Sequence, residues 1–348
     1  MALQDKIPVI GSTGSGGRRN YGKRTVALLG TTDFEFMLTS SANDITRFTE
    51  EILRQNPCFF VMHSGDGGVD EATGVIMKQN PHPPNTAVFL LKGGTANNLA
   101  EILRLSDVHY SARLARELAS GKLNLEDYVN ATDILKVTYD DDKTLYTVTS
   151  FNIGMVSQAC YGAEKGGISA ISNYFKRNGM KIITYTIESL KGAFRYHPIK
   201  AELTYDFGEE KKSFVLSDLL DMNIINGRKH AAIKEWNYKG NPCDGQLEVM
   251  CFKDMSILKM SRILGSMMLD QKRPYLSHYK EEDGYNPYGI NYTENVKGLE
   301  IRILDQSKNK QLYLEMGGNA WPIEKPDSPI KAELIPGAIN FVYGNRNK

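Results

Sequence analysis

The chain has 348 residues, of which 41% are hydrophobic and 24% charged, values typical of a globular protein with room for two domains. Its formal net charge of +1 favours neither nucleic acid nor an acidic surface as the main partner. The first residues, MALQDKIPVIGSTGSGG, lack the basic segment and long apolar region of a signal peptide. No run reaches the roughly 18 apolar residues that span a bilayer. We therefore expect a cytoplasmic protein whose membrane contact, if it has any, is peripheral.

The four cysteines show no CxxC spacing and lie in or near apolar stretches: Cys58, Cys160, Cys243 and Cys251. This distribution favours reduced core residues over metal ligands or disulfides. The six histidines show no HExxH spacing, so no zinc enzyme of that type is indicated. His63 precedes a glycine-rich turn and is expected either to face a site there or to lie in the core.

The first third of the chain alternates short apolar runs with longer mixed segments. Strands are predicted, in chain order, at 7–11, 25–30, 34–40, 58–63 and 86–93. Helices are predicted at 42–56, with Asn43 or Asp44 as the N-cap, and at 69–79 and 95–105. Alternating strands and helices of this kind form βαβ units with a mainly parallel sheet.

After about residue 130 the predicted elements are mostly strands separated by polar turns. They lie at 133–140, 143–155, 199–207, 212–226, 245–252, 297–304, 310–316 and 332–344. Helical spacing occurs only at 168–178, 183–194 and 256–270. We expect an α/β domain at 1–130 and a β-rich domain at 131–348, with a return of the extreme C-terminus to the first domain left open.

Three predicted strands of the first domain end in glycine-rich turns: GSTGSGG (11–17), SGDGG (64–68) and KGGTANN (92–98). Ligands of open α/β sheets bind at the carboxyl ends of the strands, and glycine lets backbone N–H groups approach a phosphate. Together the three turns predict a nucleotide site. The turn at 11–17 is not a Walker loop, because Gly17 stands where lysine is required. It is not a Rossmann fingerprint either, because Arg19 replaces the last glycine.

The segments SGDGGVDEATGVI and FLLKGGTANNLAEIL resemble the two glycine turns of the diacylglycerol kinase catalytic-domain family, which includes sphingosine kinases and bacterial soluble lipid kinases. The matching residues are Gly65, Asp66, Gly67, Glu71, Gly94, Thr95, Asn97 and Ala100. Ser15 and Gly16 match the end of the family's first loop. Weaker matches at 131–137, 150–159, 223–232 and 241–250 extend the resemblance over most of the chain.

The resemblance implies an α/β nucleotide-binding domain followed by an antiparallel β-sandwich, with the active site in the cleft between them. It implies transfer of the γ-phosphate of ATP to a hydroxyl group, a reaction that depends on positioning and charge neutralisation. The implied ATP-binding residues are Ser12, Thr13, Ser15, Gly16, Thr39, Gly65, Asp66, Gly67, Gly68, Glu71, Lys92, Gly94, Thr95 and Asn97. The implied ligands of Mg²⁺ are Asp66, Asp133 and Asp244, since hard cations prefer carboxylate oxygens.

Some of these residues have a plainer alternative. Asp66 is expected to act catalytically through the metal, and its alternative is a turn residue that caps the next helix. Lys92 replaces the family's proline, either as an extra cation near the nucleotide or as a solvated lysine.

The largest departure from the family pattern lies near the C-terminus. Where the family carries an Asp-Gly-Glu turn with the general base, this chain has Gly317-Gly318-Asn319. Glu315, two residues earlier, is the candidate substitute base, and its alternative is an exposed strand glutamate. A loose phosphoryl-transfer transition state tolerates a weak base, so this departure does not exclude activity.

Three functions therefore stay open. The first is an ATP- and Mg²⁺-dependent kinase that acts on a lipid or lipid-like alcohol at the membrane periphery. The second is an ATP-binding regulatory relative without kinase activity, and the third is a kinase for a soluble alcohol. No nucleic-acid partner is expected, and a homodimer is left open.

Overall fold

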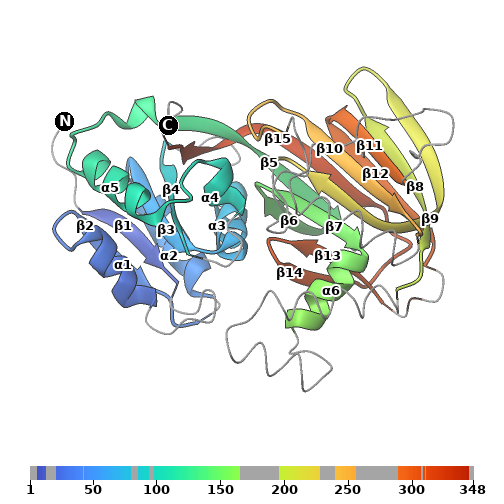
Figure 1. Cartoon of the computed structure of the whole chain (residues 1–348), viewed down its shortest axis with the longest axis horizontal. Coiled ribbons are helices and arrows are strands. Elements are labelled where there is room, and N and C mark those ends of the chain that lie inside the picture. Colours follow the sequence, from blue (N-terminus) through green and yellow to red (C-terminus); the bar gives the residue numbers. More distant parts are fainter. Residues whose placement is uncertain are drawn as a thin grey trace. The chain divides into compact units, whose positions relative to one another are not determined.

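The computed structural model describes residues 6–12, 21–41, 43–79, 85–93, 98–164, 196–227, 240–255, 289–306, 309 and 311–344. The chain divides into two compact units (Figure 1). Unit 1 comprises 1–134, 146–148 and 336–348, and unit 2 comprises 135–145 and 149–335. The helices predicted at 168–178, 183–194 and 256–270 lie outside the described residues. No helix in the described ranges is long and apolar enough to cross a membrane.

Unit 1 is built on a parallel sheet with the strand order β4-β3-β1-β2. Its strands are β1 (Ile7–Gly11), β2 (Phe34–Leu38), β3 (Phe59–Ser64) and β4 (Ala87–Lys92). Its helices are α1 (Tyr21–Leu29), α2 (Asp44–Gln55), α3 (Asp66–Gln79), α4 (Asn98–Ile102) and α5 (Val108–Ala119), and the 3-10 helix η2 (Leu125–Asp127) follows them. β1, β3 and β4 are almost wholly buried, as a parallel sheet covered on both faces requires.

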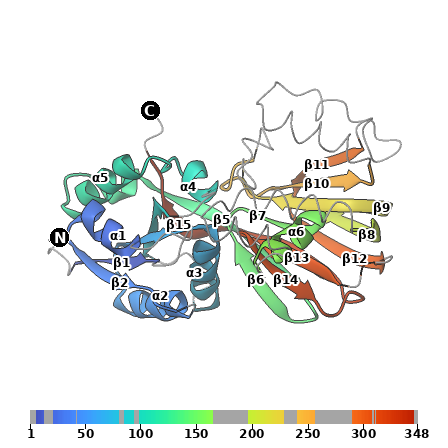
Figure 2. The ribbon, with the colours of Figure 1, turned by 60° about the horizontal axis from the view of Figure 1, so that its bottom comes forward.

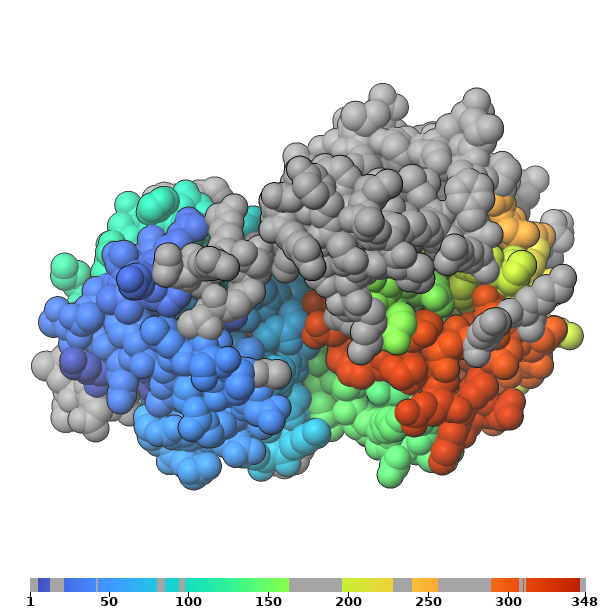
Figure 3. Space-filling model, turned by 90° about the horizontal axis from the view of Figure 1, so that it is seen from below, coloured from blue at the N-terminus to red at the C-terminus, as the bar shows by residue number. Residues whose placement is uncertain are grey.

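The helices of unit 1 lie in two layers, one on each face of the sheet. α1 packs against α5, and α2 packs against α3, so the two pairs cover opposite faces (Figure 2). On its outer side α2 presents Arg47 and Arg54, whose side chains are 66% and 72% exposed. Figure 3 shows surface from this part of the chain in blue. The sequence thus forms a three-layer unit whose strands all point their carboxyl ends to one edge.

The segment 25–30, predicted as a strand, belongs to helix α1, and that prediction is wrong. A short apolar run does not by itself distinguish a buried strand from a buried helix. β1 and β2 are adjacent and parallel, and a parallel pair requires a crossover connection, which α1 provides. The helix at 108–119 was not predicted, and the helix predicted at 95–105 is shorter, spanning Asn98–Ile102.

The start of α2 differs in detail from the expected cap. Asn43 occupies the N-cap position without a side-chain hydrogen bond. The Asp44 carboxylate instead accepts the backbone N–H groups of Ser40 and Ser41, at 2.6 and 2.8 Å. The N–H group of Ser40 chiefly holds the pKa of Asp44 below its usual range. Asp44 therefore fixes the turn between β2 and α2 instead of capping the helix in the usual way.

Unit 2 is a β-rich unit in which antiparallel pairs link most of the strands. The order along the sheet is β14-β13-β7-β9-β8-β12, with β10 and β11 joined beside β9. Its strands and helix are β6 (Lys143–Thr147, of which 146 and 147 belong to unit 1), β7 (Ser150–Gly154), α6 (Met155–Glu164), β8 (Ile199–Asp206), β9 (Lys211–Ile225), β10 (Leu247–Lys253), β11 (Ile290–Val296), β12 (Gly298–Asp305), β13 (Leu312–Met316) and β14 (Asn319–Ile323). α6, β11 and β14 were not predicted. The fold class expected from the sequence, an α/β part followed by a β-rich antiparallel part, is confirmed.

Two long strands contribute to both units. β5 (Val129–Tyr139) and β15 (Ile330–Val342) each begin in one unit and end in the other. In unit 2 β15 pairs antiparallel with β12, and in unit 1 it pairs parallel with β4 through Phe341 and Val88. The division falls at Pro336, which has no N–H to donate, next to Gly337, which has a φ of 59°. The backbone therefore leaves regular strand geometry at this point.

The core of unit 2 lies on one face of its strands and consists of alternate side chains. Met222, Ile224, Phe151, Ile153 and Leu314 all belong to this cluster and are fully buried. The same strands turn Asn223, Asn152 and Glu315 to the opposite face, because successive strand residues alternate.

We expect opposite effects from two glycine-to-alanine changes in unit 1. A Cβ on Gly93 would lie 2.7 Å from the backbone nitrogen of Ser64, so Gly93→Ala should destabilise the protein by about 1–3 kcal/mol. Gly74 lies inside α3 with its nearest neighbour at 3.9 Å, so Gly74→Ala should be neutral or stabilise by up to about 1 kcal/mol. Urea unfolding measures both changes. A Gly93→Ala variant as stable as the parent would contradict the close approach of the β3 and β4 ends.

Candidate functional site

The carboxyl ends of the four parallel strands lie side by side in unit 1. The backbone N–H of Ser12 donates to the carbonyl of His63 at 3.1 Å, and that of Thr39 donates to Gly11 at 2.9 Å. At the next pair, the N–H of Gly93 donates to the carbonyl of Ser64 at 3.1 Å. The structure therefore brings the predicted residues Ser12, Thr39, Gly65 and Lys92 to one edge. We call this edge, with the turns that follow the strands, the carboxyl edge.

Asp66 connects two of the glycine-rich turns. It is the first residue of α3, and its carboxylate accepts the backbone N–H groups of Asn98 at 3.0 Å and Leu99 at 3.3 Å. These residues begin α4, so Asp66 caps α4 and not the helix that directly follows its own turn. The N–H groups of Gly68 and Val69 are satisfied by the carbonyl of Gly65. The Asp66 side chain thus holds the 64–68 turn against the start of α4.

The environment of Asp66 works against its negative charge. Burial raises the pKa of the carboxyl, and Glu101 adds to this effect. The N–H groups of Asn98 and Leu99, together with the positive charge of Lys92, oppose it. A carboxylate in such a place gains from a nearby cation, which favours its ionised form.

Two further predicted residues of this edge have protein partners. Glu71 on α3 accepts a hydrogen bond from the hydroxyl of Thr46 on α2, at 2.9 Å. Lys92 lies 3.6 Å from Glu101 on α4, with 32% of its side chain exposed. Lys92 is therefore an ion-paired, partly exposed cation near Asp66.

The other predicted residues of the nucleotide turns fall partly inside and partly outside the described residues. Thr13, Ser15, Gly16, Gly94, Thr95 and Asn97 lie outside the described residues. Gly67 and Gly68 are described, and a Cβ on Gly68 would lie 2.1 Å from the hydroxyl oxygen of Ser64. Close packing against Ser64 at the end of β3 therefore favours glycine at position 68.

The side chain of His63 lies in the core, whereas its backbone carbonyl belongs to the carboxyl edge. It is fully buried, and its Nδ1 atom lies 2.6 Å from the hydroxyl of Thr25 on α1. Burial lowers the pKa of the ring to about 4, and the positive charge of Arg24 adds to the effect. Of the two positions expected for His63, the structure selects the core. Cys243 is exposed and Cys58 is partly exposed, so the expected core position is wrong for Cys243.

The described residues contain no group of three or more His, Cys, Asp or Glu side chains that could hold a metal ion. Asp133 is buried on β5 and accepts the N–H of Gly337 at 2.8 Å. Asp244 is exposed in a turn and accepts the N–H of Gln246 at 3.0 Å. Asp66 likewise accepts two N–H groups, but burial raises its pKa, so a nearby cation would stabilise its ionised form. Mg²⁺ in proteins commonly binds one or two carboxylates together with phosphate oxygens, so a site of that kind needs few protein ligands.

In unit 2, Gly317 and Gly318 form the two-residue turn of the β13–β14 hairpin. Their φ angles are 55° and 85°, and Met316 pairs directly with Asn319. A turn with positive φ at both central positions strongly favours glycine. Gly317 and Gly318, which together with Asn319 stand where the family pattern has Asp-Gly-Glu, suit this hairpin geometry.

Glu315 is buried and holds the hairpin turn. Its Oε1 atom accepts the N–H of Gly318 at 2.6 Å, and its Oε2 atom accepts a hydrogen bond from the amide of Asn152. Only 5% of Glu315 is exposed, so the alternative of an exposed strand glutamate is wrong. Hydrogen bonds from neutral donors let a carboxylate stay buried.

Glu315 belongs to a row of buried polar side chains that the sequence analysis missed. Direct cross-strand pairing joins Glu315 to Asn152 and Asn152 to Asn223. Asp221, on the same face of β9 as Asn223, accepts hydrogen bonds from the Asn223 amide at 3.1 Å and from the N–H of Val156 at 3.0 Å. We call Glu315, Asn152, Asn223 and Asp221 the polar row. In the sequence, the signal for this row was the pair of polar residues Asp221 and Asn223 at alternate positions of β9. The same alternation is typical of a strand with one face exposed to water.

Two features make the polar row sensitive to charge. The pKa of Asp221 is raised to about 7, chiefly by burial and in part by the negative charge of Glu315, against the hydrogen bonds from Val156 and Asn223. Within the described part of unit 2, the Oδ1 atoms of Asn152 and Asn223 are buried without a hydrogen-bond partner. Rotation of either amide can therefore present an acceptor to a new donor in the row.

Comparisons with known proteins agree with this geometry. The family model described as diacylglycerol kinase catalytic domain matches residues 11–130, which confirms the resemblance read from the glycine turns. No curated protein sequence matches the chain significantly.

Solved structures with the same fold come from Bacillus anthracis str. Sterne. A "putative diacylglycerol kinase" is 16% identical, with a TM-score of 0.68 over 98% of this chain and 97% of that chain. Another is 15% identical, with a TM-score of 0.66 over 99% of each chain. A structure described as diacylglycerol kinases is also 15% identical, with a TM-score of 0.59 over 98% of this chain and 97% of that chain. At these identities the likeness concerns the fold.

The raised pKa of Asp221 predicts a loss of stability with rising pH. The folded state keeps the proton up to about pH 7, whereas the unfolded chain releases it near 3.9. The contribution to stability is therefore complete below about pH 4 and is lost as the pH rises to about 7. Between about pH 5 and 8, the free energy of unfolding of the wild type should fall by on the order of 2–3 kcal/mol more than that of the Asp221→Asn variant.

Urea unfolding of both proteins at the two pH values measures this difference. Asparagine keeps the size of the side chain and can accept the N–H of Val156, while its amide can donate to Asn223. Equal pH dependence in the two proteins would mean that Asp221 titrates normally.

Proposed function

Starting from a chain whose residues 11–130 match the diacylglycerol kinase catalytic domain, we propose that this protein transfers the γ-phosphate of ATP to a hydroxyl group of a lipid or lipid-like alcohol. The observation that carries the proposal is the Asp66 carboxylate, which joins the 64–68 turn to the start of α4 at the carboxyl edge. Ligands of open α/β sheets bind at this edge. A protein of this kind is a kinase that depends on ATP and Mg²⁺.

Each part of the carboxyl edge has a role in the proposed reaction. The N-terminal end of α3 directs positive partial charge toward the edge and suits the phosphates of ATP. Asp66 holds the turn and α4 together, so the N–H groups near it keep fixed directions, as electrostatic preorganisation requires. Lys92, fixed by Glu101, adds a positive charge beside Asp66. Positioning and charge neutralisation are the main demands of phosphoryl transfer.

Mg²⁺ bound by Asp66 and by phosphate oxygens would neutralise charge on the transferred group. Burial raises the pKa of Asp66, and a divalent cation would reverse this effect by favouring the ionised carboxylate. The residue that takes the proton of the acceptor hydroxyl is proposed to be Glu315, the carboxylate nearest in sequence to the family's missing pair. Its hydrogen bonds from Gly318 and Asn152 fix its orientation.

The acceptor is proposed to be a lipid-like alcohol of the diacylglycerol or sphingoid type, reached by peripheral contact of a cytoplasmic protein with a membrane. This part rests on the family match alone. A soluble alcohol is the alternative acceptor. A homodimer stays compatible with the proposal, which does not depend on the number of subunits.

One observation favours a second candidate function, an ATP-binding regulatory protein without kinase activity. The β13–β14 turn is formed by Gly317 and Gly318, so no carboxylate lies in the turn itself. Glu315 is buried and accepts hydrogen bonds from two groups of the protein, which reduces its strength as a base.

Asp66→Asn should abolish most of the transfer from radiolabelled ATP to a panel of hydroxyl-bearing lipids and soluble alcohols. We expect a loss on the order of 100-fold or more, together with weaker binding of Mg-ATP, because the carboxylate charge is removed. Asp107→Asn is the matched control, because Asp107 also accepts two N–H groups at a helix start but caps α5. The panel separates lipid from soluble acceptors. Binding of ATP without transfer to any acceptor would support the regulatory alternative instead.

Glu315→Gln tests the proposed base. The glutamine keeps the acceptor for Gly318, and its amide can donate to Asn152 after rotation of that side chain, so stability should change by less than about 1 kcal/mol. We expect kcat to fall by about 100-fold or more if Glu315 takes the proton. Glu333→Gln, on an exposed part of β15, is the control. An active enzyme with unchanged kcat would show that the base is another group.

A further inference from the structure

The polar row of unit 2 contains two buried amide oxygens that receive no hydrogen bond. In the described part of the chain, the Oδ1 atoms of Asn152 and Asn223 have no donor, and the two residues are 0% and 1% exposed. Nearly all buried polar atoms of proteins are satisfied, so such exceptions point to a bound water, an ion or a structural cause. Proposed kinase chemistry gives these two oxygens no role.

The two oxygens belong to neighbouring side chains. Asn152 on β7 pairs directly with Asn223 on β9, so both side chains stand on one face of the sheet. The Cβ atoms of such a pair lie about 4.5–5.5 Å apart. Because hard cations such as Ca²⁺ bind oxygen ligands at about 2.3–2.6 Å, a single ion can contact both amide oxygens across this separation.

The amide nitrogens already have partners, which identifies the two oxygens as free acceptors. Asn223 donates from Nδ2 to the carboxylate of Asp221 at 3.1 Å, and the amide of Asn152 donates to Glu315. An ionised carboxylate only accepts hydrogen bonds, so turning either amide over would place two acceptors against each other. The row therefore offers oxygen acceptors and needs a donor or a cation between them.

The charge of the row favours a cation over a water molecule. Asp221 is 3% exposed and forms no ion pair among the described residues, while the negative charge of Glu315 acts on it. Buried charges in proteins are paired or coordinate metals. A water molecule satisfies amide oxygens but leaves the charge of Asp221 without a counterion.

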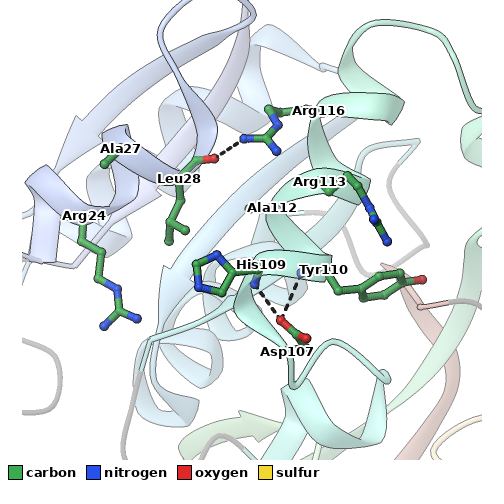
Figure 4. Close-up of a pocket in the computed structure, with 9 residues that line it drawn as sticks. All are labelled: Arg24, Ala27, Leu28, Asp107, His109, Tyr110, Ala112, Arg113 and Arg116. Atoms are coloured by element: carbon green, nitrogen blue, oxygen red, sulfur yellow. Dashed lines mark hydrogen bonds between the residues drawn. The ribbon is translucent and has the colours of Figure 1, made fainter.

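An aspartate at another helix start shows the contrast. Asp221 accepts the N–H of Val156 at the start of α6, and Asp107 accepts two N–H groups at the start of α5. Asp107, however, borders a groove that also contains Arg113, whose positive charge favours the ionised carboxylate (Figure 4). The protein thus supplies a cation for Asp107, whereas no described residue does so for Asp221.

We propose that the polar row binds a hard divalent cation, Ca²⁺ in preference to Mg²⁺, through Asp221 and the Oδ1 atoms of Asn152 and Asn223. Each carboxylate oxygen of Asp221 accepts one printed hydrogen bond's worth of donor, from Val156 or from Asn223, and has a second lone pair for a metal. The site lies in unit 2, is distinct from Asp66 and does not depend on the proposed kinase activity.

The ligand types decide between the two divalent ions. Ca²⁺ accepts carboxylate and amide oxygens in flexible arrangements, whereas Mg²⁺ demands a near-ideal octahedron and usually keeps several waters. Asp221 and Glu315 together carry the charge that balances a divalent ion. Through the amide of Asn152, which donates to Glu315, the ion would also fix the orientation of that carboxylate.

Equilibrium dialysis of the full chain followed by metal analysis measures the ion directly. After treatment with a chelator and without nucleotide, the wild type should take up a single Ca²⁺ and bind Mg²⁺ more weakly. Asp221→Asn should bind Ca²⁺ about tenfold or more weakly, because the charge of the ligand set falls. Two variants serve as controls and should bind Ca²⁺ as the wild type does. Asp107→Asn removes the same charge at another helix start, and Asp66→Asn removes the carboxylate of the proposed Mg-ATP site.

A second measurement locates the ion in the wild type itself, so the test does not depend on the folding of a variant. The NMR signals of the side-chain amides of Asn152 and Asn223 should shift when Ca²⁺ is added. Ca²⁺ should also raise the urea midpoint of the wild type, because an ion that binds only the folded state stabilises it.

Two results would overturn the proposal. A wild type that takes up no Ca²⁺ and keeps its amide signals unchanged would show that the row holds no ion. Uptake that is lost in Asp66→Asn and kept in Asp221→Asn would place the ion at the carboxyl edge.

Discussion

The contact between the Asp66 carboxylate and the N–H groups of Asn98 and Leu99 determines the geometry of the carboxyl edge. Parallel strands bring their ends to one edge, but the pairing of the strands does not by itself fix the turns that follow them. One carboxylate that accepts two N–H groups from a distant turn supplies this missing link. The close approach of Gly93 to Ser64 brings the two turns near enough for the contact to form.

The same contact explains how a carboxylate can lie buried in a glycine-rich turn at this edge. Asp66 is stabilised by two N–H groups and by the charge of Lys92, against the cost of burial. These groups do not fully offset the burial, because the pKa of Asp66 is raised. A cation at this position is the simplest physical complement to the site, and the phosphates of a nucleotide would bring the cation with them.

Unit 2 uses a different arrangement of charge. Its polar row buries Glu315 and Asp221 behind a sheet whose other face is the apolar core. Backbone N–H groups and side-chain amides donate hydrogen bonds to both carboxylates. Such a row responds to protonation, because neutral donors stabilise a buried charge only in part.

The sequence by itself determined the strands of the α/β part, the three glycine turns and the family that they resemble, because apolar periodicity and turn chemistry are local properties. It did not identify 25–30 as part of a helix, since the need for a crossover arises only when β1 and β2 pair. Tertiary structure also decided that Asp66 caps α4, that His63 is buried and that Glu315 supports a hairpin. Each of these depends on a partner distant along the chain or on a turn geometry, neither of which a residue pattern specifies.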